Sequence, residues 1–113
     1  MTRTFVTTSV FNKRWEELGL ADDDLRELEI YLMENPSSGD VIRGTGGAIK
    51  LRWRLPNMGK SSGIRIIYID IIIAKQVHLL TCYSKSKKDN LTESEKQSIK
   101  TIAKRIIKNE RAE

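Results

Sequence analysis

The hydrophobic period of the chain changes near residue 40, from a helical spacing to the alternation that is typical of strands. Thr4–Thr8 has the β-branched and aromatic content of a short strand, and Ser9 is placed to cap the helix after it. Apolar residues then recur on one helical face, first from Phe11 to Leu18 and again from Leu25 to Leu32. These patterns predict a strand followed by two helices.

The segment after residue 40 predicts a series of short strands. Gly44-Thr45-Gly46-Gly47 is expected to be a tight connection rather than a phosphate cradle, because it lacks the Gly-Lys-Ser/Thr end of a P-loop and precedes a strand. Lys75-Gln76 is expected to form a turn, although neither glycine nor asparagine stands there. The expected strands are Val41–Ile42, Ala48–Leu55, Ile64–Ile73 and Val77–Tyr83.

The last predicted element is a helix that begins near residue 92. Thr92 and Glu95 have the spacing of a capping box, and an apolar stripe continues from Ile99 to Ile106. The order of elements indicates an α+β fold in which two N-terminal helices and a C-terminal helix pack on a small antiparallel β-sheet. At 113 residues, the chain is expected to form a single domain, residues 1–113.

One predicted strand, Ile49–Leu55, alternates apolar and cationic residues without a break. On a strand this alternation turns the apolar residues toward a core and aligns Lys50, Arg52 and Arg54 on the other face, about 7 Å apart. A row of cations at this spacing suits a polyanion such as a nucleic-acid backbone.

The net charge of +5 is unevenly distributed. Residues 43–88 contain ten basic residues and one acidic residue, whereas residues 1–42 contain four basic and nine acidic residues. A long basic segment of this kind is typical of a nucleic-acid-binding face. No apolar stretch approaches the ~20 residues that span a bilayer, and no signal peptide is recognisable, so we expect a cytoplasmic protein without membrane contact.

Metal and thiol chemistry are not expected. The chain has one histidine and one cysteine, and carboxylates do not cluster in its basic half. His78 alternates with apolar neighbours and is interpreted as a structural histidine. Cys82 has no evident base partner and cannot form an internal disulfide. The sequence therefore predicts neither a metal nor a cofactor.

Arg65 stands in an otherwise apolar strand, where an unpaired charge would be costly. The one carboxylate of the basic segment, Asp70, is five positions away on the opposite face of the strand. A partner from residues 1–40 remains possible. We favour the alternative, in which Arg65 faces an anionic ligand at the end of the strand.

A further basic cluster follows the last predicted strand, at residues 83–88. Tyr83, Lys85 and Lys87 share one parity, so an extended chain would bring a phenol and two ammonium groups to one side. For Lys88, a solvated loop position is the simpler interpretation. Crowded ammonium groups lower one another's pKa, which can leave one lysine neutral enough to accept a proton.

These groups together would form a site with strong cations, a proton donor and no metal. Such a site fits the cleavage of RNA, in which a base takes the ribose 2′-OH proton, the oxygen attacks the adjacent phosphorus, and arginines stabilise the added negative charge. The candidate catalytic residues are Lys50, Arg52, Arg65, Tyr83 and Lys85. The residues expected only to bind nucleic acid are Arg43, Arg54, Lys60, Lys87 and Lys88.

Five short motifs stand in a defined order along the chain. They are Gly39 to Gly47, Lys50-x-Arg52, Gly63 to Tyr68, Leu79 to Lys85, and Asp89 to Thr92. Their order and spacing resemble the RelE/HigB branch of type II toxin–antitoxin toxins. The resemblance runs from about residue 4 to residue 108.

This resemblance implies a ribosome-dependent endoribonuclease that cuts mRNA without a metal and is inhibited by a cognate, DNA-binding antitoxin encoded by a neighbouring gene. It matches Arg65 to a strand arginine that stabilises the scissile phosphate, and Lys50 and Arg52 to positions used for base catalysis and phosphate contact. Tyr83 and Lys85 fall where the family places residues near the leaving group. A C-terminal tyrosine used by some members has no counterpart after residue 88, so the general acid is not assigned.

Two other functions stay open. The related ParE branch inhibits DNA gyrase, and a module without chemistry would use the cationic strand only to hold RNA. The acidic residues 16–34 also have two interpretations: solvated helix faces, or a contact with a basic partner or the antitoxin.

Overall fold

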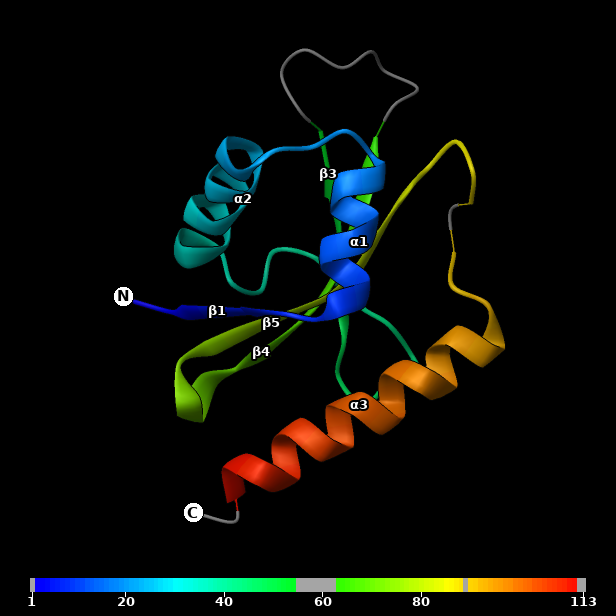
Figure 1. Ribbon diagram of the computed structural model, residues 1–113. Coiled ribbons are helices and arrows are strands. Elements are labelled where there is room, and N and C mark those ends of the chain that lie inside the picture. The colour runs from blue at the N-terminus through cyan, green and yellow to red at the C-terminus, as the bar shows by residue number, and fades with distance from the viewer. Residues whose placement is uncertain (1, 55–62, 89, 112–113) are drawn as a thin grey trace.

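The computed structural model describes residues 2–54, 63–88 and 90–111 (Figure 1). Within these ranges the chain forms a five-stranded sheet, three α-helices and a short 3₁₀ helix, which confirms the predicted α+β class. The elements are β1 (Thr4–Thr7), α1 (Ser9–Glu17), α2 (Asp22–Glu34), β2 (Asp40–Val41), β3 (Ile49–Trp53), β4 (Ile64–Ile71), η1 (Ile72–Ala74), β5 (Gln76–Ser84) and α3 (Glu93–Arg111). None of the helices in these ranges is long and apolar enough to cross a bilayer.

The strands lie in the order β1-β5-β4-β3-β2. Neighbouring strands are antiparallel except for β1, which pairs in parallel with β5, so the sheet is mixed rather than antiparallel throughout. Two backbone hydrogen bonds extend this pairing, from the Thr4 N–H to the Lys75 carbonyl (2.8 Å) and from the Thr8 N–H to the Leu79 carbonyl (3.1 Å). The parallel direction depends on contacts between residues far apart in the chain, which a local sequence pattern does not contain.

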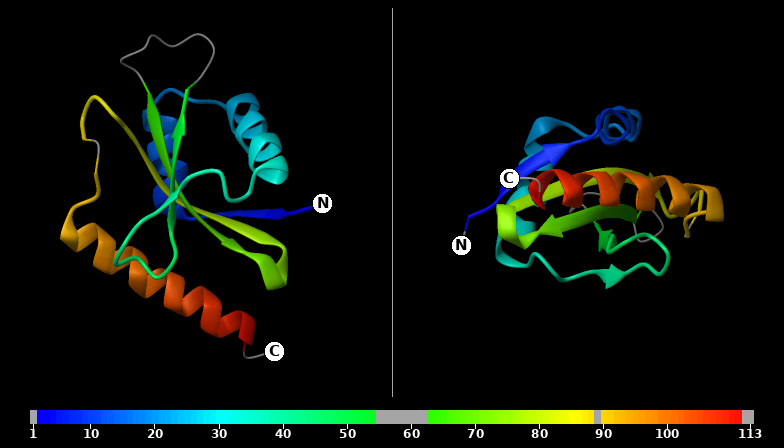
Figure 2. Two further views of the ribbon diagram at one scale, coloured as in Figure 1. Left: turned by 180° about the vertical axis from the view of Figure 1, so that it is seen from behind. Right: turned by 90° about the horizontal axis from the view of Figure 1, so that it is seen from below.

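The helices α1 and α2 cover one face of the sheet, and α3 covers the other (Figures 1 and 2). Thr8, rather than the predicted Ser9, caps α1: its Oγ1 accepts a hydrogen bond from the Phe11 N–H (3.0 Å). Thr8 has the extended backbone that a cap requires, whereas Ser9 already lies in the helix.

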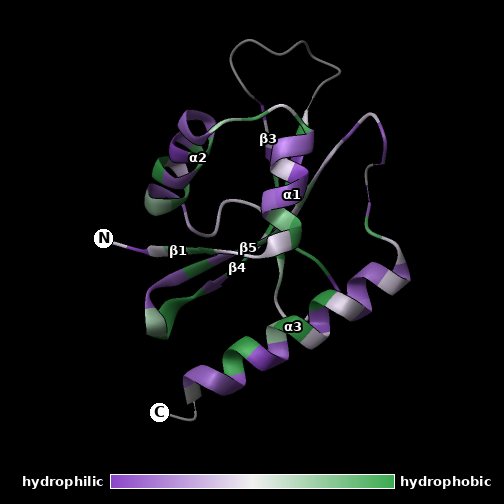
Figure 3. Ribbon diagram, in the orientation of Figure 1, coloured by the Kyte–Doolittle hydropathy of each residue, from purple (hydrophilic) through white to green (hydrophobic). Residues whose placement is uncertain are grey.

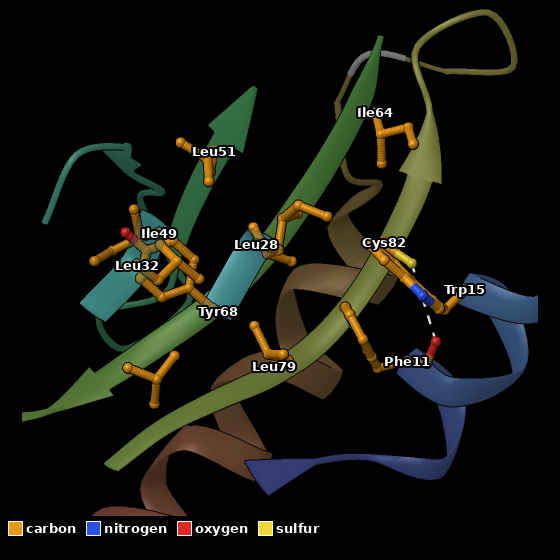
Figure 4. Close-up of a cluster of buried hydrophobic side chains, with 12 residues drawn as sticks. Phe11, Trp15, Leu28, Leu32, Ile49, Leu51, Ile64, Tyr68, Leu79 and Cys82 are labelled. Atoms are coloured by element: carbon orange, nitrogen blue, oxygen red, sulfur yellow. Dashed lines mark hydrogen bonds between the residues drawn. The ribbon is translucent and has the colours of Figure 1, made fainter. Parts of the chain in front are cut away.

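The core between α1, α2 and the sheet contains an aromatic pair, which lies beside Cys82 (Figure 4). Phe11 and Trp15 stack with their ring centroids 5.4 Å apart, and the Cys82 thiol donates to the Phe11 carbonyl oxygen with an S···O distance of 4.0 Å. Ile49 and Leu51 of β3 are buried in the same core, as the alternation predicted.

A second core lies between α3 and the opposite face of the sheet. The hydropathy colouring of Figure 3 shows apolar residues interspersed with hydrophilic ones along α3. Ile99 and Ala103 of this helix are buried with Ile67, Leu80 and other residues of the sheet. The predicted capping box is present: the Glu95 N–H donates to Thr92 Oγ1 (3.1 Å), and the Thr92 N–H donates to Glu95 Oε1 (2.8 Å).

The glycine-rich segment Gly44–Gly47 is a turn, as predicted. The three glycines in it have positive φ angles of 75–113°. Buried Thr45 closes the turn, because its Oγ1 donates to the Ile42 carbonyl (2.6 Å) and accepts from the Ala48 N–H (3.1 Å). The chain then enters β3 directly.

The hairpin between β4 and β5 differs from the prediction. The strand predicted to reach Ile73 ends at Ile71, and Ile72–Ala74 forms a 3₁₀ turn. Lys75 completes the turn with a left-handed backbone (φ 54°), the conformation for which glycine or asparagine would have been the sequence signal.

Candidate functional site

The site is a row of three residues across neighbouring strands. Arg52 of β3 lies opposite Arg65 of β4, and Arg65 lies opposite Tyr83 of β5. Side chains at directly opposed antiparallel positions point to the same face of the sheet. Because Tyr83 belongs to the core beneath α3, the row lies on the α3 face. The structure therefore brings together three of the predicted catalytic residues, which are separated by up to 31 positions in sequence.

The arrangement of two arginines in this row is unfavourable for stability. Like charges at directly opposed positions of a sheet destabilise it by a few tenths of a kcal/mol to about 1 kcal/mol. Arg65 is also buried, with 5% of its surface exposed. Two guanidinium groups on adjacent strands are the arrangement expected of a site that receives an anion.

Gly63 lies next to the Arg65 guanidinium. A Cβ atom added at Gly63 would lie 3.4 Å from Arg65 Nη1, which is tighter than most contacts of a real Cβ. The Gly63 carbonyl accepts a hydrogen bond from the Lys85 N–H (2.9 Å), so β4 and the chain after β5 stay together at this end.

Asp70, the carboxylate of the basic segment, does not neutralise the row. Its Oδ1 lies 2.9 Å from Nε of Arg3, and both side chains are more than nine-tenths buried. This ion pair connects Arg3, which precedes β1, to Asp70 on β4. The Asp70 carboxylate therefore pairs with Arg3.

Lys50 lies on the same face as Arg52, two positions earlier on β3, opposite Ile67 of β4. Its Nζ donates a hydrogen bond to Asn90 Oδ1 (3.1 Å). Asn90 precedes α3 and had no predicted role; its position in the Asp89 to Thr92 motif is the one sequence signal that could have identified it. The site therefore includes the segment that leads into α3.

The predicted alternation of Tyr83, Lys85 and Lys87 is wrong beyond Tyr83. The strand ends at Ser84, and residues 85–87 form a turn that is closed by hydrogen bonds from the Lys87 and Lys88 N–H groups to the Ser84 carbonyl. Both Lys85 and Lys87 are exposed. Their roles in catalysis and binding stay predictions, but strand parity no longer supports them.

Lys88 is engaged with protein groups rather than simply solvated. Its Nζ forms an ion pair with Glu95 and lies 4.9 Å from the centroid of the Tyr83 ring. Partial burial alone would raise the pKa of Glu95, but hydrogen bonds from Lys88 and Thr92 and the charge of Lys88 outweigh it, so the pKa is lowered. The capping box was evident in the sequence, whereas this second use of Glu95 was not.

The remaining predicted binding residues lie at the margins. Arg43 is exposed in the turn before β3. Arg54 is exposed but follows the end of β3 at Trp53, so the predicted row of three cations on one strand has two members. Lys60 lies outside the described residues.

Cys82 and His78 are engaged in contacts within the fold. Burial raises the pKa of the Cys82 thiol to about 12, with Arg14 acting weakly in the opposite direction, so this thiol is not a nucleophile at neutral pH. His78 is hydrogen-bonded to the Gln76 side chain (3.0 Å). Among the described residues, no group of three or more histidine, cysteine or acidic side chains could hold a metal ion.

Two solved structures share this fold. A double arginine-to-alanine mutant of E. coli toxin RelE in the free state is 18% identical, with a TM-score of 0.56, and the match covers 78% of this chain and 88% of that one. The intact E. coli RelBE toxin–antitoxin complex contains a chain that is 19% identical, with a TM-score of 0.53, matched over 72% of this chain and 94% of that one. This chain thus shares the fold of these two structures.

A family model described as the RelE toxin of the RelE/RelB toxin–antitoxin system matches residues 2–113. The chain therefore belongs to the RelE toxin family, in agreement with the resemblance seen in its motifs.

Proposed function

We propose that this toxin is a metal-independent endoribonuclease that cuts mRNA on the ribosome and thereby stops translation. The observation that carries the proposal is the pairing of Arg52 with Arg65 and of Arg65 with Tyr83 on one face of the sheet. Lys50, two residues from Arg52 on that face, adds a further group that can exchange a proton. Guanidinium groups at opposed positions of adjacent strands are suited to bind one phosphate group.

The reaction that suits this row is attack of a ribose 2′-oxygen on the adjacent phosphorus. A base removes the 2′-OH proton, the P–O bond to the 5′-oxygen breaks, and that oxygen takes up a proton as it leaves. The products are a 2′,3′-cyclic phosphate and a 5′-hydroxyl. Arg52 and Arg65 stabilise the additional negative charge at phosphorus, while Lys50 and Tyr83 are the members of the site that can exchange protons.

We also propose that a cognate antitoxin binds and silences this chain, as the E. coli RelBE complex is a toxin–antitoxin assembly. The ribosome and its mRNA are the proposed targets. Family membership and the basic segment of residues 43–88 support this assignment.

The decisive experiment compares the parent protein with Arg65→Ala on purified ribosomes programmed with a defined mRNA. Loss of one preorganised cation at the transition state is expected to lower kcat about 10²- to 10³-fold. Lys104→Ala removes an exposed cation from α3 and is the matched control that keeps parent activity.

The end groups of the product RNA separate the alternatives. A 2′,3′-cyclic phosphate is expected. If the parent protein binds ribosomes without cutting mRNA, the catalytic assignment fails and a binding module remains. Inhibition of supercoiling in a gyrase assay, without RNA cleavage, would instead place this chain with the gyrase poisons.

A further inference from the structure

A chain of contacts connects the N-terminus of α3 to the site row. Lys88 Nζ lies 4.9 Å from the centroid of the Tyr83 ring and is ion-paired with Glu95 Oε2. The other carboxylate oxygen, Glu95 Oε1, accepts the Thr92 N–H of the capping box (2.8 Å). The Glu95 carboxylate therefore makes two contacts: it accepts a backbone N–H at the start of α3, and it pairs with the Lys88 ammonium group that lies over the Tyr83 ring.

These contacts contribute little to stability. Lys88 and Glu95 keep 29% and 33% of their side-chain surface exposed. Exposed ion pairs and exposed cation–π contacts each contribute about 1 kcal/mol or less. Their main physical effect is on position, because a lysine side chain without a partner samples many rotamers.

The carboxylate itself is held in place before it meets Lys88. The backbone N–H of Thr92 donates to Glu95 Oε1 (2.8 Å) and orients the carboxylate, whereas the Thr92 hydroxyl accepts the Glu95 backbone N–H (3.1 Å) and only caps the helix. A similar contact is made on β3, where Lys50 Nζ donates a hydrogen bond to Asn90 Oδ1. The segment that leads into α3 thus reaches two residues of the site.

We propose that Glu95 is a positioning residue of the toxin: by holding Lys88 over the Tyr83 ring, it keeps the phenol and the ammonium group in place for the RNA substrate. The inference rests on the proposed ribonuclease function. Glu95 does not touch the reacting atoms; it acts through Lys88.

The test separates the two contacts of Glu95. Glu95→Gln keeps an oxygen that can accept the Thr92 N–H but removes the charge facing Lys88. Glu95→Gln is expected to lower kcat for mRNA cleavage on programmed ribosomes five- to tenfold, while KM and the melting temperature stay nearly unchanged. Lys88→Met, which keeps an apolar stem on the ring, is expected to give a similar loss. The double variant is expected to lose no more than either single one.

Thr92→Ala is the structural control. It removes the hydroxyl that caps the helix but keeps the Thr92 N–H and the ion pair, so the melting temperature falls while kcat stays at the parent value. A loss of kcat in Thr92→Ala as large as that in Glu95→Gln would show a purely structural role and overturn the inference. Unchanged kcat in Glu95→Gln, or additive losses in the double variant, would also overturn it.

An activity-independent measurement completes the test. The Lys88 methylene protons near the Tyr83 ring are expected to show ring-current-shifted NMR resonances, and Glu95→Gln is expected to return them toward random-coil values. Unmoved resonances contradict the positioning role while leaving the ribonuclease proposal intact. Absence of RNA cleavage by the parent protein, in contrast, overturns the proposed function and the inference with it.

Discussion

At the scale of single residues, the partly buried His78, which lies outside the candidate site, couples the stability of this toxin to pH. Burial disfavours the imidazolium form and lowers the pKa of His78 from its ordinary 6.5, and the smaller opposing effect of Glu110 does not cancel it. The folded protein therefore holds this proton less tightly than the unfolded chain does.

This difference predicts a loss of stability in mild acid. As the pH falls below about 6.5, the unfolded chain takes up the proton first, so the free energy of unfolding falls until the folded pKa is passed. Urea unfolding at pH 7.5 and 5.5 measures the change, and His78→Gln is expected to reduce it. An identical pH dependence in the parent and the variant would refute this assignment.

Residue types were sufficient to nominate the residues of the candidate site, but not to predict the contacts around them. The unusual charge of Arg65 within an apolar strand was visible in the sequence, and so was the parity of Lys50 and Arg52. The pairing of Arg3 with Asp70 and of Lys88 with Glu95 was not, because each joins elements whose packing is decided by the whole fold.

At the scale of elements, the best predictions were those with local chemical signals. The capping box of α3 and the helical stripe of α1 are encoded within a few residues, and both are present. The turn at Ile72–Ala74 and the end of β5 at Ser84 have no such signal. The parity argument for Lys85 failed for this reason.

The approach of Gly39 to β3 gives a prediction at this scale. A Cβ atom at Gly39 would lie 2.4 Å from the Lys50 carbonyl oxygen and 2.6 Å from Ile49 Cγ2. Gly39→Ala must therefore displace β2 or β3, and we expect a loss of about 1–3 kcal/mol in the free energy of unfolding. We also expect lower RNA cleavage, because Lys50 moves with its backbone.

Urea unfolding and the cleavage assay measure the two effects of Gly39→Ala. Ser37→Ala, at an exposed position of the same connection, is the matched control and should behave as the parent does. A Gly39→Ala protein with parental stability would show that the segment before β2 adapts without cost.

At the scale of the whole molecule, charge is divided between two regions of the chain. The segment of residues 1–42, which is net acidic, supplies β1, α1 and α2. The segment of residues 43–88, which is net basic, supplies β3, β4 and β5, the three strands of the candidate site. Under the proposed function, this division predicts an electrostatic contribution to RNA binding that depends on salt.

The salt dependence of binding tests which cations contact phosphate. With an mRNA carrying 2′-O-methyl groups to block cleavage, log Kd is expected to rise linearly with log salt. Lys87→Ala is expected to reduce the slope by about 0.7, the value for one phosphate contact on a single strand. Lys13→Ala, from the acidic region, should leave it unchanged. Equal slopes for all three proteins would exclude Lys87 from the interface.

The parallel pairing of β1 with β5 also bears on when, during synthesis, the candidate site is completed. Thr4–Thr7 is translated well before its partner strand Gln76–Ser84, so β1 has no partner strand in this sheet until β5 has been made. Tyr83 arrives with that same strand. The parallel pair and the row of Arg52, Arg65 and Tyr83 are therefore completed by the same strand, so under the proposed function a growing chain gains its ribonuclease site only once β5 has been made.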